Sequence, residues 1–382
     1  MTEQPRAFAQ PIYVTKPMLP PLEDYTSRLQ DIWASGTLSN GGPQHRALEA
    51  ALSAYLDHQN VSLFTNGTLA LVTACQALRL SGEVITTPFT FPATPHVLSW
   101  NNITPVFADI DPIRMTLDPA NIEPLISART SAILAVHVYG TPCDVEGIQK
   151  IADRHGLRVI YDAAHAFGTR LDGRSVTSFG DITMLSFHAT KLFQTAEGGA
   201  LVARDLTVKQ RIDYLKNFGI QNESMVLMPG INGKMNELQA ALGLLTLDMV
   251  EAEQRRRRQI GEIYRERLGP VEGITLPVCS PDFTPSQQYF VIRIDAAVCG
   301  VTRDTMFEQM KAFNLFPRRY FFPLCSEYSC YRMLPSAHPS YLPAAHRAAS
   351  EVLCLPYYGA LSDDDAHRIC DILLFLMKRD VH

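Results

Sequence analysis

The sequence predicts an α/β protein in which a larger part, with a mostly parallel seven-stranded sheet, precedes a smaller C-terminal α/β part. Short apolar runs alternate with helical patterns over the first 200 residues, and this alternation is typical of a parallel sheet covered by helices. One long helical pattern then separates these runs from a second, shorter set of elements. A chain of 382 residues that is 46% hydrophobic can bury one large core and a smaller companion core.

The first half of the chain gives the clearest element boundaries. Prolines concentrated before residue 22 predict an extended arm, and a turn cluster at 38–43 separates two helical stretches, 22–35 and 44–56. The predicted strands cover residues 61–64, 83–87, 104–109, 132–138, 157–162, 183–187 and 200–202. Helices are predicted between these strands at residues 68–80 and 145–155.

The second half begins with a long helix predicted over residues 236–268, interrupted or bent near the four arginines at 255–258. These arginines stand among Glu and Gln, a pattern typical of a solvated helix face. A strand at 288–294 and helices at 302–313 and 363–378 follow. We therefore predict an arm and large domain at 1–250 and a small domain at 251–382.

Charge and cysteine usage narrow the classes of function. A net charge of −5 gives no reason to expect a nucleic acid or an anionic membrane as partner. No segment has the apolar length of a membrane span and the first ten residues lack a secretory signal, so we expect a cytoplasmic protein. The eight cysteines form no CxxC pair, which disfavours zinc and predicts buried free thiols. No metal site is expected.

The segment FTNGT at 64–68 joins a predicted strand to a predicted helix. Gly67 allows a tight turn, Thr68 can cap the helix, and the free N–H groups at the helix start favour an anion such as phosphate. Neither GxGxxG nor GxxxxGK[ST] occurs, so dinucleotide and P-loop sites are not supported. Many α/β turns share this pattern, and an ordinary turn stays open.

Asp162 ends an apolar strand, where catalytic groups of open α/β sheets gather. Its carboxylate could pair with the protonated pyridine nitrogen of pyridoxal 5'-phosphate (PLP), or it could cap a following helix. His165, three residues later, could reach a cofactor ring or be a buried histidine with its own partners. The pattern alone does not separate these alternatives.

Lys191 follows the strand 183–187 within SFHATK. The chain has eight lysines, and most of the others lie in surface-like helical contexts. A lysine in a partly desolvated pocket has a lowered pKa and can attack a carbonyl. A surface lysine after a strand is the alternative that the spacing leaves open.

Together with these residues, a series of segments resembles the DegT/DnrJ/EryC1/StrS family of PLP-dependent nucleotide-sugar aminotransferases, which have fold type I (aspartate aminotransferase-like). The resemblance covers about residues 14–358, with the segments in the family's order and spacing. They are TNGTLAL (65–71), TTPFTFPAT (86–94), PVFADIDP (105–112), VHVYGTPCD (136–144), VIYDAAHAFG (159–168), LSFHATKLFQTAEGGA (185–200), NFGI (217–220), GINGKMNELQAALG (230–243) and RRYFFPL (318–324).

The resemblance implies a role for each residue of the candidate site. Lys191 would form a Schiff base with PLP and move the proton between the donor and cofactor carbons. Asp162 would pair with the pyridinium nitrogen, and His165, where the family often has Gln, would bond the phenolic oxygen. Phe91 would stack on the pyridine ring. The phosphate would be held by Gly67, Thr68 and Ser186.

The resemblance also implies a second subunit. Asn232 would reach the phosphate of the neighbouring subunit's cofactor, which makes a homodimer with shared active sites necessary. The substrate-binding candidates, by position only, are Lys234, Arg318, Arg319 and Tyr320. His188 and Lys234 either contact the site or substrate phosphates, or serve packing and surface roles.

The implied reaction moves the amino group of L-glutamate to a nucleotide-linked keto sugar by ping-pong kinetics. The forms SFHATK…EGG and GINGKM resemble the branch that aminates C4 of dTDP-4-keto-6-deoxy-D-glucose, giving dTDP-4-amino-4,6-dideoxy-D-glucose for O-antigen or other polysaccharides. A C3 aminotransferase or one that uses UDP- or GDP-sugars is the alternative. A sugar dehydratase is disfavoured because such relatives replace the lysine with His. A non-catalytic PLP-binding regulator is the remaining class.

Overall fold

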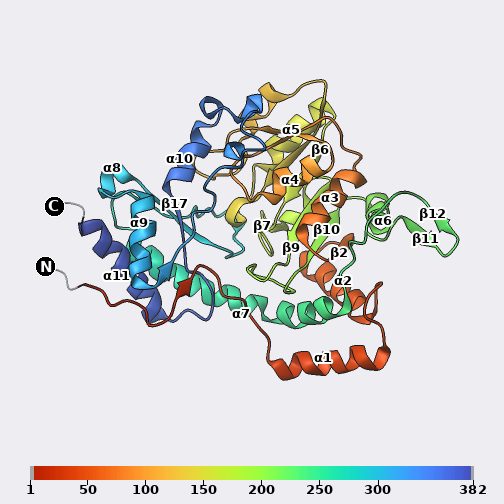
Figure 1. Cartoon of the computed structure of the whole chain (residues 1–382), viewed down its shortest axis with the longest axis horizontal. Coiled ribbons are helices and arrows are strands. Elements are labelled where there is room, and N and C mark those ends of the chain that lie inside the picture. Colours follow the sequence, from red (N-terminus) through yellow and green to blue (C-terminus); the bar gives the residue numbers. More distant parts are fainter. Residues whose placement is uncertain (1–3, 380–382) are drawn as a thin grey trace.

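A seven-stranded sheet in the order β2-β10-β9-β6-β5-β3-β4 forms the centre of the larger part (Figure 1). The computed structural model describes residues 4–379, so the first three residues of the predicted arm and the last three of the predicted small domain lie outside it. β10 is antiparallel to both of its neighbours and the other pairings are parallel, which confirms the predicted mostly parallel sheet. The strands are β2 (Val61–Phe64), β3 (Glu83–Thr86), β4 (Thr104–Phe107), β5 (Thr130–Val136), β6 (Arg158–Asp162), β9 (Ile182–Ser186) and β10 (Gly199–Ala203).

Helices cover both faces of this sheet because its strands are apolar on both sides. Side chains from α3, α4 and α6 pack on one face, and side chains from α2, α5 and the first half of α7 pack on the other. Local caps set the helix ends: Asp144 accepts the Gly147 N–H at the start of α5, and Gly156 ends it in the left-handed region. The helices are α1 (Leu22–Ser35), α2 (Pro43–Leu56), α3 (Gly67–Ala77), α4 (Ala93–Trp100), α5 (Val145–His155), α6 (Leu206–Leu215) and α7 (Glu237–Leu268).

The C-terminal part has its own apolar core between the sheet β13-β15-β17 and the helices α9, α11 and the end of α7. The N-terminal arm crosses this part: Phe8 is buried in that core, and β1 (Ile12–Tyr13) pairs with β16 (Leu315–Phe316). Both described chain ends therefore lie at the same side of the molecule (Figure 1). The strands of this sheet and the α-helices of the C-terminal part are β13 (Ile274–Thr275), β15 (Phe290–Ile294), α8 (Ala296–Cys299), α9 (Arg303–Met310), α10 (Pro343–Glu351), β17 (Val352–Leu355) and α11 (Asp363–Arg379).

The long helix α7 joins the two parts and runs unbroken past the four arginines, so the predicted interruption is absent. The division at 250/251 falls within this helix and stays a prediction. Arg257 is 1% exposed, with its Nε 2.7 Å from Glu253 Oε1 and its Nη1 3.2 Å from the Gln287 carbonyl. The solvated-face prediction is thus wrong for Arg257, because the helical period places it on the face of Ile260 and Tyr264.

The structure tests the expectation that the cysteines are buried free thiols. All eight cysteines are free, but Cys279 and Cys330 are exposed, so the prediction of buried thiols is wrong for these two. Between residues 4 and 379, no helix combines the length and hydropathy needed to cross a membrane. Over the same residues, no cluster of His, Cys, Asp and Glu side chains could hold a metal ion.

The buried arginine of α7 gives a first testable prediction. Arg257→Met should lower the free energy of unfolding by about 3 kcal/mol, because it leaves the Glu253 carboxylate without its buried partner. The exposed neighbour Arg255 forms only a surface ion pair, so Arg255→Met should change stability by about 0.5 kcal/mol or less. Urea unfolding of the two variants measures the difference, and equal losses would contradict it.

Candidate active site

The carboxyl ends of β2, β9 and β6 lie at one edge of the sheet and bring the predicted site together. β10 begins between β2 and β9, where Gly199 pairs with both Phe64 and Ser186. Asp162 ends the next strand, β6, and pairs with Met184 of β9. The turn before α3, the Ser186 hydroxyl and the Asp162 carboxylate are therefore side by side, as expected at the ends of neighbouring strands.

The start of α3, which follows β2, is the part of this site suited to bind an anion. Asn66 caps the helix by accepting the Leu69 N–H at 2.8 Å, so Thr68 is not the cap but an exposed residue in the first turn. Two glycines allow the helix to approach the sheet: a Cβ on Gly199 would lie 2.7 Å from the Gly67 nitrogen, and one on Gly67 would lie 3.2 Å from Ser186 Cβ. The helix start, with its unpaired N–H groups, thus faces the Ser186 side of the site.

Asp162 is buried and holds two hydrogen bonds. Thr94 Oγ1 donates to Oδ2 at 2.8 Å, and the Ala164 N–H donates to Oδ1 at 3.0 Å. Residues 163–168 form turns, so no helix follows for Asp162 to cap. Burial raises the pKa of Asp162, whereas the Ala164 N–H, the Thr94 hydroxyl and nearby Lys191 favour the ionised carboxylate.

Lys191 lies in the loop after β9 and is only partly exposed. The buried side chain of Gln288 fixes the backbone on both sides of it: Oε1 accepts the Leu192 N–H at 2.6 Å, and Nε2 donates to the Thr190 carbonyl at 3.0 Å. Burial lowers the pKa of Lys191 to about 8, and the Asp162 carboxylate partly opposes this shift. An appreciable fraction of the amine is therefore unprotonated and nucleophilic near neutral pH.

His165 is buried among aromatic rings. Phe321 stacks on it at 5.7 Å with an interplanar angle of 7°, and Tyr289 meets it edge-on at 5.1 Å. Its Nδ1 accepts the Tyr139 N–H at 3.2 Å, so this nitrogen carries no proton. Burial, reinforced by Lys191, holds the pKa of His165 well below its usual range. The ring is therefore neutral, with its proton on Nε2, and that nitrogen is a hydrogen-bond donor.

Phe91 completes the group of residues that fits PLP. Its ring is 57% exposed, and its carbonyl accepts the N–H of Thr94, the partner of Asp162. An apolar ring, a buried carboxylate and a helix start match a flat aromatic molecule that carries a cationic nitrogen and a phosphate. Lys191 adds the amine that a pyridoxal aldehyde requires. The described residues therefore fit PLP.

The structure does not bring every predicted residue to this edge. Lys234 Nζ donates to Asn217 Oδ1 at 2.9 Å and to Asn232 Oδ1 at 2.8 Å. The backbone of Lys234 forms an isolated antiparallel β-bridge with Phe64, on the side of the outermost strand β2 that faces away from β10. Asn232 and Lys234 thus lie at the outer side of the sheet. His188 is exposed and lies 3.6 Å from Glu197.

The three C-terminal substrate candidates differ in their surroundings. Arg318 is exposed. Arg319 is 2.7 Å from the Asp304 carboxylate, so its charge already has a partner. The Tyr320 ring packs edge-on against Tyr289 at 5.6 Å, and its carbonyl accepts the Tyr139 hydroxyl. Tyr320 therefore borders the aromatic wall around His165.

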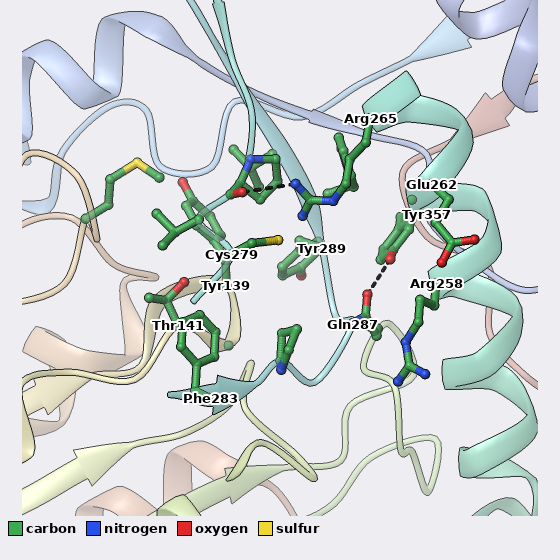
Figure 2. Close-up of a pocket in the computed structure, with 18 residues that line it drawn as sticks. Tyr139, Thr141, Arg258, Glu262, Arg265, Cys279, Phe283, Gln287, Tyr289 and Tyr357 are labelled. Atoms are coloured by element: carbon green, nitrogen blue, oxygen red, sulfur yellow. Dashed lines mark hydrogen bonds between the residues drawn. The ribbon is translucent and has the colours of Figure 1, made fainter. Parts of the chain in front are cut away.

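A cavity of about 320 Å³ borders this wall (Figure 2). Tyr139 and Tyr289 line it, together with Arg258 and Arg265 of α7. Figure 2 shows the Tyr357 hydroxyl directed at Gln287, and the Arg265 guanidinium donates to the Pro277 carbonyl at 3.3 Å. Neither Lys191 nor Asp162 is among the residues that line this cavity.

Sequence reasoning missed several residues that shape the site. Thr94 carried a usable signal, because it lies three residues after Phe91 in the segment TTPFTFPAT. The remaining ones contact the site from distant parts of the chain; two of them lie in the family segments 136–144 and 318–324 but were given no role there, and two follow no local pattern. They are Tyr139, Gln288, Tyr289 and Phe321.

Comparisons with known proteins give matches to sugar aminotransferases. The profile of the DegT/DnrJ/EryC1/StrS aminotransferase family matches residues 22–374. The dTDP-4-amino-4,6-dideoxy-D-glucose transaminase of Escherichia coli is 45% identical over 368 residues, 95% of this chain and 98% of that protein. The spore coat polysaccharide biosynthesis protein SpsC of Bacillus subtilis (strain 168) is 31% identical over 94% of each chain. The crystal structure of DesI in the presence of its TDP-sugar product superposes with a TM-score of 0.94 at 39% identity, over 98% of this chain and 95% of that one.

The lowered pKa of Lys191 predicts how its reactivity depends on pH. In the cofactor-free protein, acetylation of Lys191 by acetic anhydride should reach half of its maximal rate near pH 8, because only the unprotonated amine reacts. Asp162→Asn should move the midpoint to lower pH, since the carboxylate that favours the ammonium form is gone. Mass spectrometry of the peptide containing Lys191 measures both profiles. A midpoint of about 10.4, the value of a free lysine, would contradict the prediction.

Proposed function

The chain belongs to the DegT/DnrJ/EryC1/StrS aminotransferase family, and from this membership we propose that it transfers the amino group of L-glutamate to C4 of dTDP-4-keto-6-deoxy-D-glucose. It is a nucleotide-sugar aminotransferase that uses PLP. The products would be 2-oxoglutarate and dTDP-4-amino-4,6-dideoxy-D-glucose, a building block for polysaccharides such as O-antigen. The observation that carries the choice of sugar is the 45% identity to the E. coli transaminase over nearly the whole of both chains.

The residues at the sheet edge have complementary parts in this reaction. PLP, when bound, supplies the electron sink that makes a proton on the adjacent substrate carbon removable. Lys191 Nζ, with a pKa of about 8, can take such a proton in one half-reaction and return it in the other. Asp162 would face the ring nitrogen as a carboxylate and favour its protonated form. Each role follows from the group that the side chain presents.

The remaining contacts orient the cofactor. His165 Nε2 would donate to the phenolic oxygen, since Nδ1 is already occupied as an acceptor. The start of α3 at Gly67 and Thr68, with the Ser186 hydroxyl, would hold the phosphate. Phe91 would cover one face of the ring and lose its exposure in doing so.

A homodimer with shared active sites is part of the proposal. The hairpin of β11 (Ile220–Asn222) and β12 (Met225–Val226) projects from the body opposite to the chain ends (Figure 1). It exposes apolar side chains, among them Val226 at 65%, which a second copy of the chain could cover. Asn232 follows this hairpin and lies two residues before Lys234, which pairs with Phe64 of β2; in the proposal, Asn232 contacts the phosphate of the neighbouring subunit's cofactor. Lys234, Arg318, Arg319 and Tyr320 are proposed to contact the nucleotide sugar.

We also propose that the enzyme works in the cytoplasm. The described residues contain no helix suited to cross a membrane, and none of the cysteines is paired. Nucleotide sugars and L-glutamate, the proposed substrates, are small polar molecules. Neither a nucleic acid nor a membrane is needed as a partner.

The choice of sugar is tested with purified enzyme, L-glutamate and a panel of keto sugars linked to dTDP, UDP and GDP. We expect dTDP-4-keto-6-deoxy-D-glucose to give an amino sugar with nitrogen at C4, identified by mass spectrometry and NMR. Lys191→Ala should abolish turnover, because it removes the amine that is proposed to form the Schiff base. Absence of product from this substrate, or nitrogen at C3, would refute the proposal.

The shared site is tested by mixing subunits. A dimer of one Lys191→Ala subunit and one Asn232→Ala subunit, isolated with two affinity tags, has one site with both defects and one intact site if Asn232 acts on the neighbour. We expect such mixed dimers to show about half of the wild-type activity, well above either variant alone. If Asn232 acts within its own chain, no intact site forms and the mixed dimer stays as weak as the Asn232→Ala enzyme.

A further inference from the structure

We propose that Thr94 is a positioning residue for Asp162, and that Thr90 and the C-terminal loop at 324–336 hold Thr94 in place. Thr94 is fully buried and its hydroxyl is 2.8 Å from Asp162 Oδ2. The link between these two side chains stands on geometry alone. Its consequence for the cofactor rests on the proposed function, in which Asp162 faces the ring nitrogen.

The Asp162 carboxylate needs such donors to remain ionised. Burial disfavours a charged carboxylate, and without hydrogen bonds it would take up a proton instead. A protonated Asp162 could not stabilise a cationic ring nitrogen. Two donors counter this: the Ala164 N–H on Oδ1 and the Thr94 hydroxyl on Oδ2. The backbone donor is present in any variant, so Thr94 is the side chain that can set the balance.

The Asp162 carboxylate fixes which hydroxyl donates in the two hydrogen bonds that link it to Thr94 and Thr90. An ionised carboxylate only accepts hydrogen bonds, so the Thr94 proton points to Asp162. Thr90 Oγ1 lies 2.9 Å from Thr94 Oγ1, and it must therefore donate to Thr94. Thr90 is buried as well, with 2% of its surface exposed. Two hydroxyl groups thus donate in sequence towards the carboxylate, and each polarises the next.

The C-terminal loop fixes the segment that carries both threonines. Before them, the Cys325 N–H donates to the Pro88 carbonyl at 3.0 Å, and at the first of them the Cys325 thiol donates to the Thr90 carbonyl at 3.3 Å. After them, in α4, the Tyr331 hydroxyl lies 2.8 Å from His96 Nδ1 and 3.0 Å from Ser99 Oγ. The loop therefore holds both ends of the segment, and the C-terminal part of the chain bears on the carboxylate through it.

Four other titratable side chains lie near Asp162, and one of them is His165, whose pKa burial holds well below its usual range. Lys191 comes from the loop after β9, His137 follows β5 and donates its backbone N–H to the Asp162 carbonyl, and the Cys143 thiol interacts from beyond β5. Burial lowers the pKa of His137 to about 3 and raises that of Cys143, so both are neutral between pH 4 and 7. Lys191, with a pKa of about 8, stays charged over most of this window. Asp162 is therefore the group of this cluster that responds below pH 7.

The experiment compares Thr94→Val with Thr94→Ser and Thr86→Val. Val keeps the shape of Thr without the hydroxyl, and Ser restores the hydroxyl. Thr86→Val is the matched control, because the buried Thr86 hydroxyl bonds only the Leu134 carbonyl, at 2.7 Å, on a nearby strand. All variants are unfolded with urea at several pH values from 4 to 7, in the cofactor-free form.

The raised pKa of the buried Asp162 determines whether the stability difference between Thr94→Val and wild type grows or shrinks with pH. Its ionisation disfavours the folded state as pH rises from the unfolded value of about 3.9 through the folded value. Thr94→Val raises the folded pKa further, so its stability loss relative to wild type should grow with pH. We expect the unfolding equilibrium constant of Thr94→Val, relative to wild type, to rise about tenfold between pH 4 and 7, the effect of one pKa unit. Thr94→Ser and Thr86→Val should show no such trend, and a loss for Thr94→Val that is constant with pH would overturn the proposal.

Cofactor binding separates this proposal from the proposed function. PLP affinity, measured from the visible absorbance of the bound cofactor, should fall about tenfold in Thr94→Val and recover in Thr94→Ser. A pH-dependent stability loss without a change in PLP affinity would support the link between Thr94 and Asp162, and it would count against the proposed role of Asp162 towards the ring nitrogen.

Discussion

The candidate site depends on a carboxylate and an amine that are buried together at one edge of the sheet. Burial alone would neutralise both Asp162 and Lys191, and each partly offsets this effect on the other. A carboxylate that stays charged and an amine that can lose its proton near neutrality are the two states that a transaminase requires. The surrounding protein can be understood by how it maintains this balance. His165, buried next to the pair, avoids adding a positive charge because it stays neutral.

The strand order of the large sheet brings Asp162 and Lys191 together. Parallel strands end at the same edge, so Asp162 at the end of β6 and Lys191 in the loop after β9 come close although they are 29 positions apart in the sequence. The antiparallel strand β10 then brings Gly199 against the start of α3, and no larger residue would fit there. The amine, the carboxylate and the anion-binding helix start thus share one edge without any unusual local structure.

Much of this was predictable from the sequence. The seven strands of the large sheet and four of the helices before residue 203 were located to within a few residues, because apolar runs and turn residues mark them, but α4 (Ala93–Trp100), which carries Thr94, was missed. The ordered segments also indicated the family, and with it the residues at the sheet edge. Contacts across long stretches of chain were not predictable: Thr94 is 68 residues from Asp162, and Gln288 is 96 residues from Leu192. The burial of Arg257 was missed because the charges around it resemble a solvated face, whereas the fold brings the Gln287 carbonyl over that turn of α7.

The missed contacts have one feature in common, since most of them come from the C-terminal part of the chain. Gln288 brackets the backbone of Lys191, Phe321 and Tyr289 enclose His165, and Cys325 and Tyr331 hold the segment that leads to Asp162. The large sheet supplies the reactive groups, and the smaller part fixes their surroundings. A shift of the smaller part relative to the sheet would therefore act on the amine, the imidazole and the carboxylate together. Tyr139 and Tyr289, which line the neighbouring cavity as well, place that cavity within the same set of contacts. Precise placement of the reactive groups is thus a property of the interface between the two parts, and the large domain alone would not provide it.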